Sequence, residues 1–198
     1  ITPLNINIDI LNKEQLEEIS EKYSFSLPKD EKLLTLIKNP FYLNTYLNNY
    51  ADTNELNYND FKTKLWNKKI KDSKPERERC FLKIAFERAN SGQFFVSPNC
   101  ESNILHELVK DGILGYEDTE YFITHDIYEE WALEKKIEIE FRKRENELDF
   151  FKKIGQSLPI RRSFRNWLSE KLLLQDENIK GFIEEVFINE QVEQFWKD

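Results

Sequence analysis

The sequence predicts a mainly α-helical protein that carries one short β-hairpin. The chain has 198 residues but only 5 glycines and 6 prolines, too few turn-forming residues for an all-β fold. Apolar residues recur at spacings of three and four along much of the chain, a pattern typical of helices that bury one face. The hairpin is predicted where two short apolar segments, 113–116 and 121–124, flank the polar stretch 117–120.

The N-terminal residues predict an extended segment that leads into a helix. Residues 1–11 alternate apolar and polar side chains, so we expect an extended lead-in. Asn12 is expected to cap the first helix, and Gln15 stands where a capping box places its reciprocal partner. The buried face of this helix is expected to carry Leu16, Ile19 and Tyr23.

Two further short helices are predicted before residue 50. Asp30 is a suitable cap for one of them. Pro40 suits the first turn of the next, because a proline there leaves no unpaired N–H. We therefore expect residues 12–50 to form a small helical bundle and the polar residues 51–58 to form a linker.

Residues 59–137 predict helices on both sides of the hairpin. Asn59 is expected to cap one helix, Pro75 to start another and Gly92 to end it. A further helix is expected at about 102–111, directly before the two strands. Helix, strand, turn and strand in this order are typical of a winged-helix domain with a short β-hairpin wing.

The remaining residues, 138–198, predict only helices. The pattern from 127 to about 151 is helical and rich in charged residues, and further helices are predicted at about 160–174 and 178–188, with another beginning near Glu190. Helix pairs of this kind are compatible with a helical arm or the start of an α-solenoid.

The second strand runs into Thr124-His125-Asp126, which is followed by an amphipathic helix. The triplet resembles the Met-His-Asp motif of the STAND class of P-loop NTPases, which includes NACHT and NB-ARC proteins. The resemblance implies that His125 contacts the β-phosphate of ADP. Asp126 is expected to cap the helix and orient the histidine. Without the resemblance, the residues are explained by a simple cap and a histidine packed beside the wing.

Asn39-Pro40-Phe41 resembles the helical-lid motif of STAND and related AAA+ proteins, in which a proline packs beside the adenine base. An ordinary helix break also explains these residues. The chain has no Gly-x-x-x-x-Gly-Lys-Ser/Thr loop to hold phosphates. The resemblance therefore implies a regulatory, non-catalytic fragment of a nucleotide switch in signalling or anti-phage defence. A P-loop domain elsewhere in the parent protein would bind ADP or ATP.

The charge of the chain argues against the alternative that the winged helix regulates DNA. The net charge is −8, whereas duplex binders gain affinity from Lys and Arg on phosphates. On the expected recognition helix, Glu107 and Asp111 outweigh Lys110, and the wing is acidic. The predicted outward face of this helix carries Asn103, His106, Glu107 and Lys110, and its apolar stripe Ile104, Leu105, Leu108 and Val109.

The densest basic cluster is formed by Arg161, Arg162 and Arg165. It is a candidate contact for a protein partner, although a solvated face balanced by Glu170 and Asp176 also explains it. A third alternative for the whole chain is a helical interaction scaffold, with a protein partner or a second copy bound through the arm. An exposed apolar groove between residues 150 and 198 would favour this alternative.

The sequence also bears on metal binding, catalysis, membrane insertion and cellular location. Neither a metal-ligand cluster nor a catalytic set is evident, and no apolar run approaches the roughly 20 residues that span a bilayer. Cys80 is expected to be a buried thiol rather than half of a disulfide with Cys100, because no secretory signal is visible. Cytoplasmic location is the default expectation. The chain begins at Ile1 and holds no methionine, so we expect a fragment of a longer protein.

Overall fold

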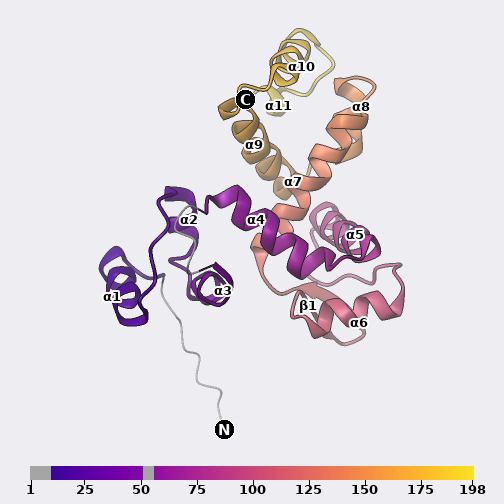
Figure 1. Ribbon diagram of the computed structural model, residues 1–198. Helices are drawn as coiled ribbons and strands as arrows, with labels where there is room; N and C mark the ends of the chain where they lie inside the picture. The colour runs from indigo at the N-terminus through magenta and orange to yellow at the C-terminus, as the bar shows by residue number, and fades with distance from the viewer. Residues whose placement is uncertain (1–9, 51–55) are drawn as a thin grey trace. The chain divides into compact units, whose positions relative to one another are not determined.

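A computed structural model describes residues 10–50 and 56–198, and it is mainly helical with one antiparallel hairpin, as predicted (Figure 1). The chain divides into two compact units, residues 1–66 and 67–198, and each is described by itself. The predicted boundaries after residues 58 and 137 fall inside these units and stay predictions. Most of the extended lead-in and of the linker, residues 1–9 and 51–55, lies outside the described residues.

The first unit is a small group of helices, and its caps follow the predicted pattern. The Asn12 side chain accepts from the Gln15 N–H, with the reciprocal bond also present, and Asp30 accepts from the Leu33 N–H at 2.8 Å. Leu33, Tyr46 and Phe61 are fully buried. The unit consists of α1 (Lys13–Tyr23), α2 (Glu31–Leu36), α3 (Pro40–Tyr50) and α4 (Tyr58–Trp66).

Two details of this unit differ from prediction. Tyr23 is 63% exposed, because α1 ends there and the following residue, Ser24, takes a left-handed conformation. The capping bond near the start of α4 comes from Asn57, whose side-chain oxygen accepts from the Asp60 N–H at 2.9 Å, and not from Asn59. Either asparagine fits the sequence pattern, so only the backbone geometry distinguishes them.

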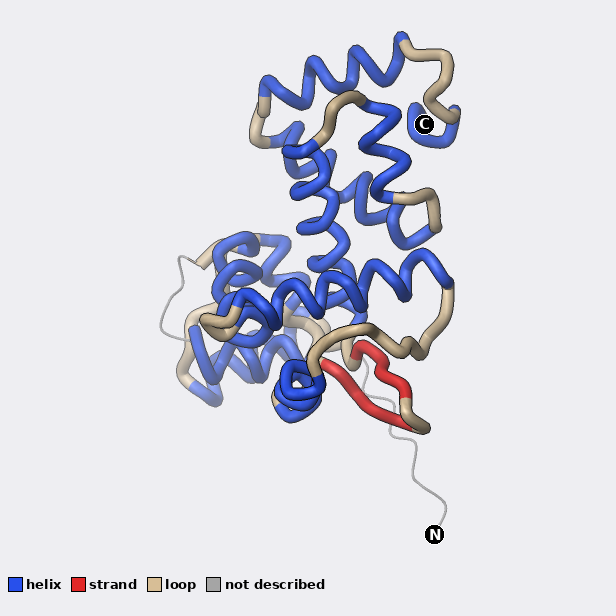
Figure 2. Tube along the Cα trace, turned by 90° about the vertical axis from the view of Figure 1, so that its right-hand side faces the viewer, coloured by secondary structure: helices blue, strands red, loops and turns tan. Residues whose placement is uncertain are grey.

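The second unit begins with the helices and hairpin of the predicted winged helix. A short π-helical turn, η1 (Asn67–Lys71), precedes α5 (Pro75–Ser91), which ends at Gly92 as expected. Val96 forms a single bridge with Tyr121 of the hairpin. α6 (Ser102–Lys110), β1 (Leu114–Glu117) and β2 (Glu120–Ile123) follow, and Figure 2 shows the two strands of this hairpin in red.

Arg77 holds the start of α5 to its neighbours. Only 2% of this side chain is exposed. Its guanidinium donates to the carbonyl oxygens of Ile70 and Lys69, at 3.1 and 2.8 Å, and to the carboxylates of Asp111 and Glu107, at 2.7 and 3.4 Å. A buried arginine is tolerated when its donors are satisfied in this way, so Arg77 links η1, α5 and α6.

The hairpin turn is shorter than the predicted stretch 117–120 by one residue at each end. β1 and β2 pair so that Gly115 faces Phe122 and Glu117 faces Glu120, leaving a two-residue turn at Asp118 and Thr119. Both turn residues have positive φ, 48° and 76°, as expected for a tight hairpin.

Continuous helix from 127 to 151 was predicted, but the structure contains a break. α7 (Asp126–Lys143) ends at Arg144, and Asn146 caps a new helix by accepting from the Asp149 N–H at 2.9 Å. Phe141 and Phe150, on either side of the break, pack together with a ring separation of 6.0 Å. The turn therefore folds the two helices onto one aromatic core.

That core continues through the last helices of the second unit. Phe150 lies 5.4 Å from Phe182 and 6.4 Å from Trp167 between ring centroids. Figure 1 shows α7 running from the hairpin region to this helical group. The group contains α8 (Glu147–Ile154), α9 (Leu158–Leu173), α10 (Glu177–Ile188) and α11 (Gln194–Lys197).

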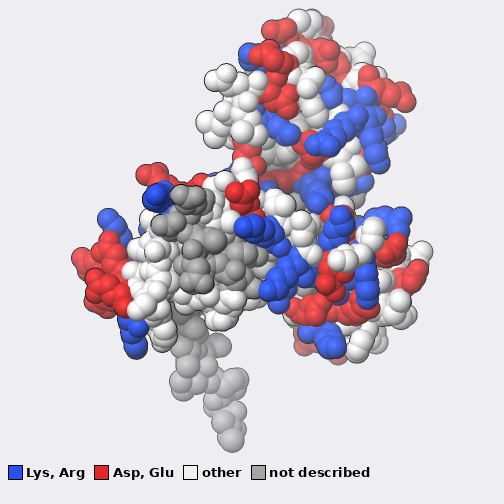
Figure 3. All heavy atoms as spheres, in the orientation of Figure 1, with Lys and Arg blue, Asp and Glu red and all other residues white. Residues whose placement is uncertain are grey.

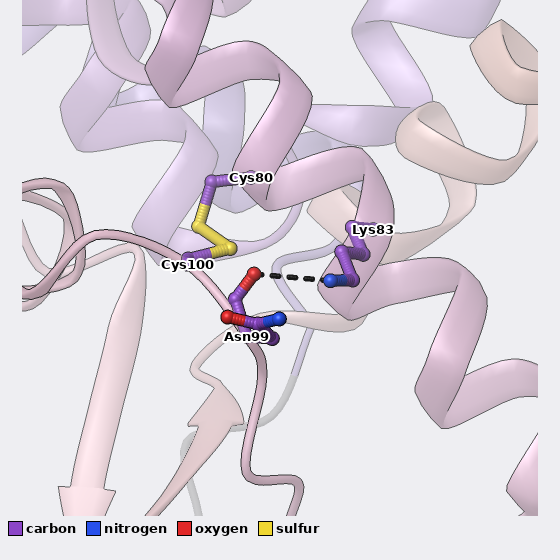
Figure 4. Close-up of a disulfide and its surroundings, with 4 residues drawn as sticks. All are labelled: Cys80, Lys83, Asn99 and Cys100. Atoms are coloured by element: carbon purple, nitrogen blue, oxygen red, sulfur yellow. Dashed lines mark hydrogen bonds between the residues drawn. A yellow bond between two sulfur atoms is a disulfide. The ribbon is translucent and has the colours of Figure 1, made fainter.

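The expectation of a free thiol at Cys80 is wrong. Cys80 of α5 and Cys100, just before α6, form a disulfide with their Cα atoms 5.9 Å apart (Figure 4). Next to it, the Lys83 ammonium donates to the Asn99 carbonyl at 3.0 Å. The chain reversal after α5 brings the two cysteines within bridging distance, which their separation in sequence does not reveal.

Candidate functional site

His125 occupies the junction between the hairpin and α7. It is the N-cap residue of α7 with an extended backbone, φ −140° and ψ 124°. The preceding Thr124 is fixed by its hydroxyl, which donates to the carbonyl oxygens of Gly112 and Ile113 at 2.7 and 3.0 Å. The end of β2 is thereby tied to the end of α6, so these two contacts of Thr124 set the position of His125.

The half-buried imidazole of His125 lies edge-on to the ring of Tyr128, with ring centroids 6.0 Å apart. Burial lowers the pKa of His125, and the negative charge of Asp126 opposes this shift only in part. Burial also raises the pKa of Tyr128 to about 12. The histidine is therefore neutral at pH 7, with a proton on one of its two ring nitrogens.

Asp126 is not the cap of α7. It is the first helical residue, its side chain is exposed, and the start of α7 has no side-chain cap among the hydrogen bonds of the structure. Its carboxylate still lies near the positive end of the helix dipole and acts on His125 through charge. The prediction failed because His125, in extended conformation, occupies the capping position itself.

The structure brings Asp126 and the arginine cluster to one groove between α7 and α9, here called the α7–α9 groove. Its volume is ≈ 730 Å³, against ≈ 390 Å³ for the second groove described below. Arg162 forms an ion pair with Glu130 across it. Opposite charges line the groove: Asp126, Glu129 and Glu130 from α7, and Arg161, Arg162 and Arg165 from α9.

The arginine cluster has a partner that the sequence did not indicate. Glu130 of α7 pairs with Arg162, while Asp176 lies 4.0 Å from Lys171. The signal available in the sequence was the spacing. Three carboxylates at positions i, i+3 and i+4 of one helix match three arginines on another, but sequence does not say which helices are neighbours.

Glu129 links the α7–α9 groove to the interior. One carboxylate oxygen lies 3.5 Å from Nε of Arg88, a side chain only 9% exposed, which also lies over the Phe94 ring at 5.0 Å. Burial raises the pKa of Glu129, and the Arg88 charge offsets part of that shift. Arg88 was not identified from the sequence, where it is one cation in a highly charged helix.

Pro40, the candidate base contact, lies in the first unit. It is the first residue of α3 and is half-buried. The Asn39 side chain accepts from the Phe41 N–H at 2.9 Å and so caps the helix around the proline. This geometry agrees with the predicted helix start, and the contact with a base stays a prediction.

The outward face of α6 offers little to DNA. Asn103, His106 and Lys110 are exposed as predicted, but Glu107 turns toward α5, where Lys74 donates to it at 2.6 Å. That bond, opposed by partial burial and reinforced by Arg77, lowers the pKa of Glu107. The apolar stripe of Ile104, Leu105 and Leu108 is buried as expected, while Val109 is half-buried.

A second groove, here called the α9–α11 groove, is lined by α9, α10 and α11 and is mostly apolar. It contains exposed large side chains, among them Leu172 and Phe187. In Figure 3, uncharged side chains gather over the part of the molecule where α9 and the chain end lie in Figure 1. An exposed apolar groove between residues 150 and 198 is the feature expected of an interaction module.

Comparison with models of known protein families and with curated proteins gives no match to this chain. Within the parts of the chain that the structure describes, every helix is too short or too polar to cross a membrane.

Proposed function

We propose that this chain is the regulatory part of a nucleotide-controlled switch, in which His125 reports the bound nucleotide to the helices that follow. The observation that carries the proposal is the position of His125. It joins the hairpin to α7, and α7 continues into the aromatic core of the α8–α11 group. A displacement of this junction would therefore reach the far helices of the unit.

The chemistry of the junction supports a phosphate contact. A neutral histidine at a helix start can donate one hydrogen bond to a phosphate oxygen, and the positive end of the helix dipole favours anions. The carboxylates of Asp126, Glu129 and Glu130 oppose an anion nearby. Three arginines of α9 line the same groove and offset them. The phosphates would come from ADP or ATP held by a P-loop domain outside this chain.

The test uses the gene product that carries this chain together with such a domain. We expect co-purifying ADP in the wild type and an ADP release about ten- to a hundredfold faster in His125→Ala. This follows from the roughly 1.5–3 kcal/mol of one charge-assisted hydrogen bond. Nucleotide content and release are measured by chromatography and by displacement of a fluorescent ADP.

His106→Ala is the matched control, because His106 is the other histidine of the sequence and is exposed on α6. It should leave ADP release unchanged. A parent protein without bound nucleotide, or equal release in wild type and His125→Ala, would remove the basis of the proposal.

A helical protein-interaction module is the second candidate, and the α9–α11 groove favours it. This function needs no nucleotide. A DNA-binding regulator is less well supported, because Glu107 and the acidic wing residues Glu117 and Asp118 surround the face that would meet phosphate.

A further inference from the structure

The α9–α11 groove has an apolar floor and one basic end. One face of α9 lines the groove with four residues at helical spacing: Arg161, Arg165, Leu168 and Leu172. The N-terminal part of this face is therefore basic and its C-terminal part is apolar. This stripe extends over about 16 Å at about 1.5 Å per residue, the length of three helical turns. The groove volume is ≈ 390 Å³.

Large apolar side chains in the groove are left open to solvent. Leu172 is 47% exposed and Phe187 is 60% exposed, although both line the groove. Phe195 and Trp196 of α11 also line it. A continuous apolar surface of this kind, bordered by charge, marks a place where another apolar surface packs.

The charges on the groove are opposite in sign to those of the chain as a whole. Arg161, Arg165 and Lys197 line it against one carboxylate, that of Asp198, while the net charge of the chain is −8. Arg161 lies over the Phe195 ring at 5.0 Å, and its Nε is buried without a hydrogen-bond acceptor among the described residues. An acidic partner would complement the positive charge at this end of the groove.

We propose that the α9–α11 groove binds an amphipathic α-helix of a partner protein, with acidic residues beside Arg161 and Arg165 and large apolar residues against Leu172 and Phe187. A helix of about three turns matches the length of the groove, and helices commonly dock in this way through apolar residues at i, i+3, i+4 and i+7. The acidic residues of the partner helix set its specificity and orientation, because basic residues in their place would be repelled by Arg161 and Arg165. The inference deepens the interaction-module candidate and is independent of the nucleotide contact.

The test measures the binding of two synthetic helical peptides to the full chain by fluorescence anisotropy. Both carry leucine at i, i+3, i+4 and i+7, one with glutamate and the other with lysine at the flanking positions. We expect the glutamate peptide to bind at least tenfold more tightly than the lysine peptide. Raising the salt concentration should reduce that ratio.

Surface variants locate the binding site. Leu172→Asp and Phe187→Asp should each weaken binding of the glutamate peptide at least tenfold. The matched controls Leu173→Asp and Ile188→Asp should change it less than twofold, because these neighbours are 84% and 80% exposed and do not line the groove. Arg165→Glu should remove the preference for glutamate, whereas Lys152→Glu makes the same charge change outside the groove and should preserve it.

Circular dichroism confirms that each variant is folded before binding is compared. The proposal is overturned by equal binding of both peptides or by no binding of the glutamate peptide. It is also overturned if sedimentation shows self-association that Phe187→Asp abolishes, since a second copy would then cover the groove. The two proposals are distinguished in the parent gene product. A groove variant such as Phe187→Asp should lose peptide binding but release ADP normally, whereas His125→Ala should release ADP faster but bind the peptide normally.

Discussion

Thr119 at the wing tip adopts a conformation that its own side chain disfavours. Its φ is 76°, a left-handed value that is unusual for a β-branched residue and common for glycine. We expect Thr119→Gly to stabilise the second unit by about 0.5–1 kcal/mol. Glycine removes the strain of the left-handed conformation, and this gain exceeds the cost of a more flexible unfolded chain. Urea unfolding followed by circular dichroism measures the change.

Thr119→Ala is the appropriate control, because alanine keeps the Cβ atom that makes positive φ unfavourable. It should recover less than half of the stability gained with glycine. A glycine variant no more stable than the alanine variant would show that the turn is not strained at this residue.

At the scale of secondary-structure elements, Glu138 links helices α7 and α9. It lies on α7, and its carboxylate accepts from Trp167 Nε1 of α9 at 2.7 Å, from Arg142 at 2.6 Å, and pairs with Lys171 of α9 at 2.8 Å. Burial alone would raise the pKa of Glu138, but these donors more than offset it, so the pKa lies below its ordinary value.

A lowered pKa makes this contribution to stability dependent on pH. The folded state favours the carboxylate, so the stabilisation is fully present above the unfolded pKa of about 4.3 and is lost as the pH falls through the lower folded value. We expect Glu138→Gln to lower the free energy of unfolding by about 1–3 kcal/mol at pH 7, and by much less near pH 3. Urea unfolding at both pH values tests this.

Glu140→Gln provides the comparison, because Glu140 pairs with Lys136 on the same helix and reaches no other element through that pair. Its loss at pH 7 should stay near 0.5 kcal/mol. If the Glu138 variant loses the same small amount, or loses equally at both pH values, the link between α7 and α9 is not electrostatic.

The elements themselves were largely predictable, because helix starts are local. Asn12, Asp30 and Pro40 act through backbone groups within four residues, so their sequence context contains the necessary information. The break at Arg144 was missed because apolar spacing continues across it, and Asn146 resembles any polar surface residue until the aromatic core is known.

At the scale of the second unit, three of the unpredicted features depend on contacts between distant segments. The ion pair of Arg162 with Glu130, the buried pair of Arg88 with Glu129 and the α9–α11 groove require knowing which helices are neighbours. The sequence identified His125 and the arginine cluster separately. Only the fold shows that the arginines line one groove with Asp126, the neighbour of His125.

The disulfide between Cys80 and Cys100 has a consequence for the whole unit. It closes a chain segment that contains the end of α5, the bridge residue Val96 and the approach to α6, with a sequence separation of 20. Closing a loop of this length removes unfolded-state entropy equivalent to about 3 kcal/mol. We therefore expect reductant to lower the free energy of unfolding by about that amount in the wild type, measured by urea unfolding with and without dithiothreitol.

The double variant Cys80→Ala/Cys100→Ala separates the bond from other effects of the reductant. It should unfold like the reduced wild type and should not respond to dithiothreitol, and alkylation with iodoacetamide should detect free thiols only in the reduced wild type. Free thiols in the purified, unreduced protein, with a stability that reductant does not change, would contradict the bond.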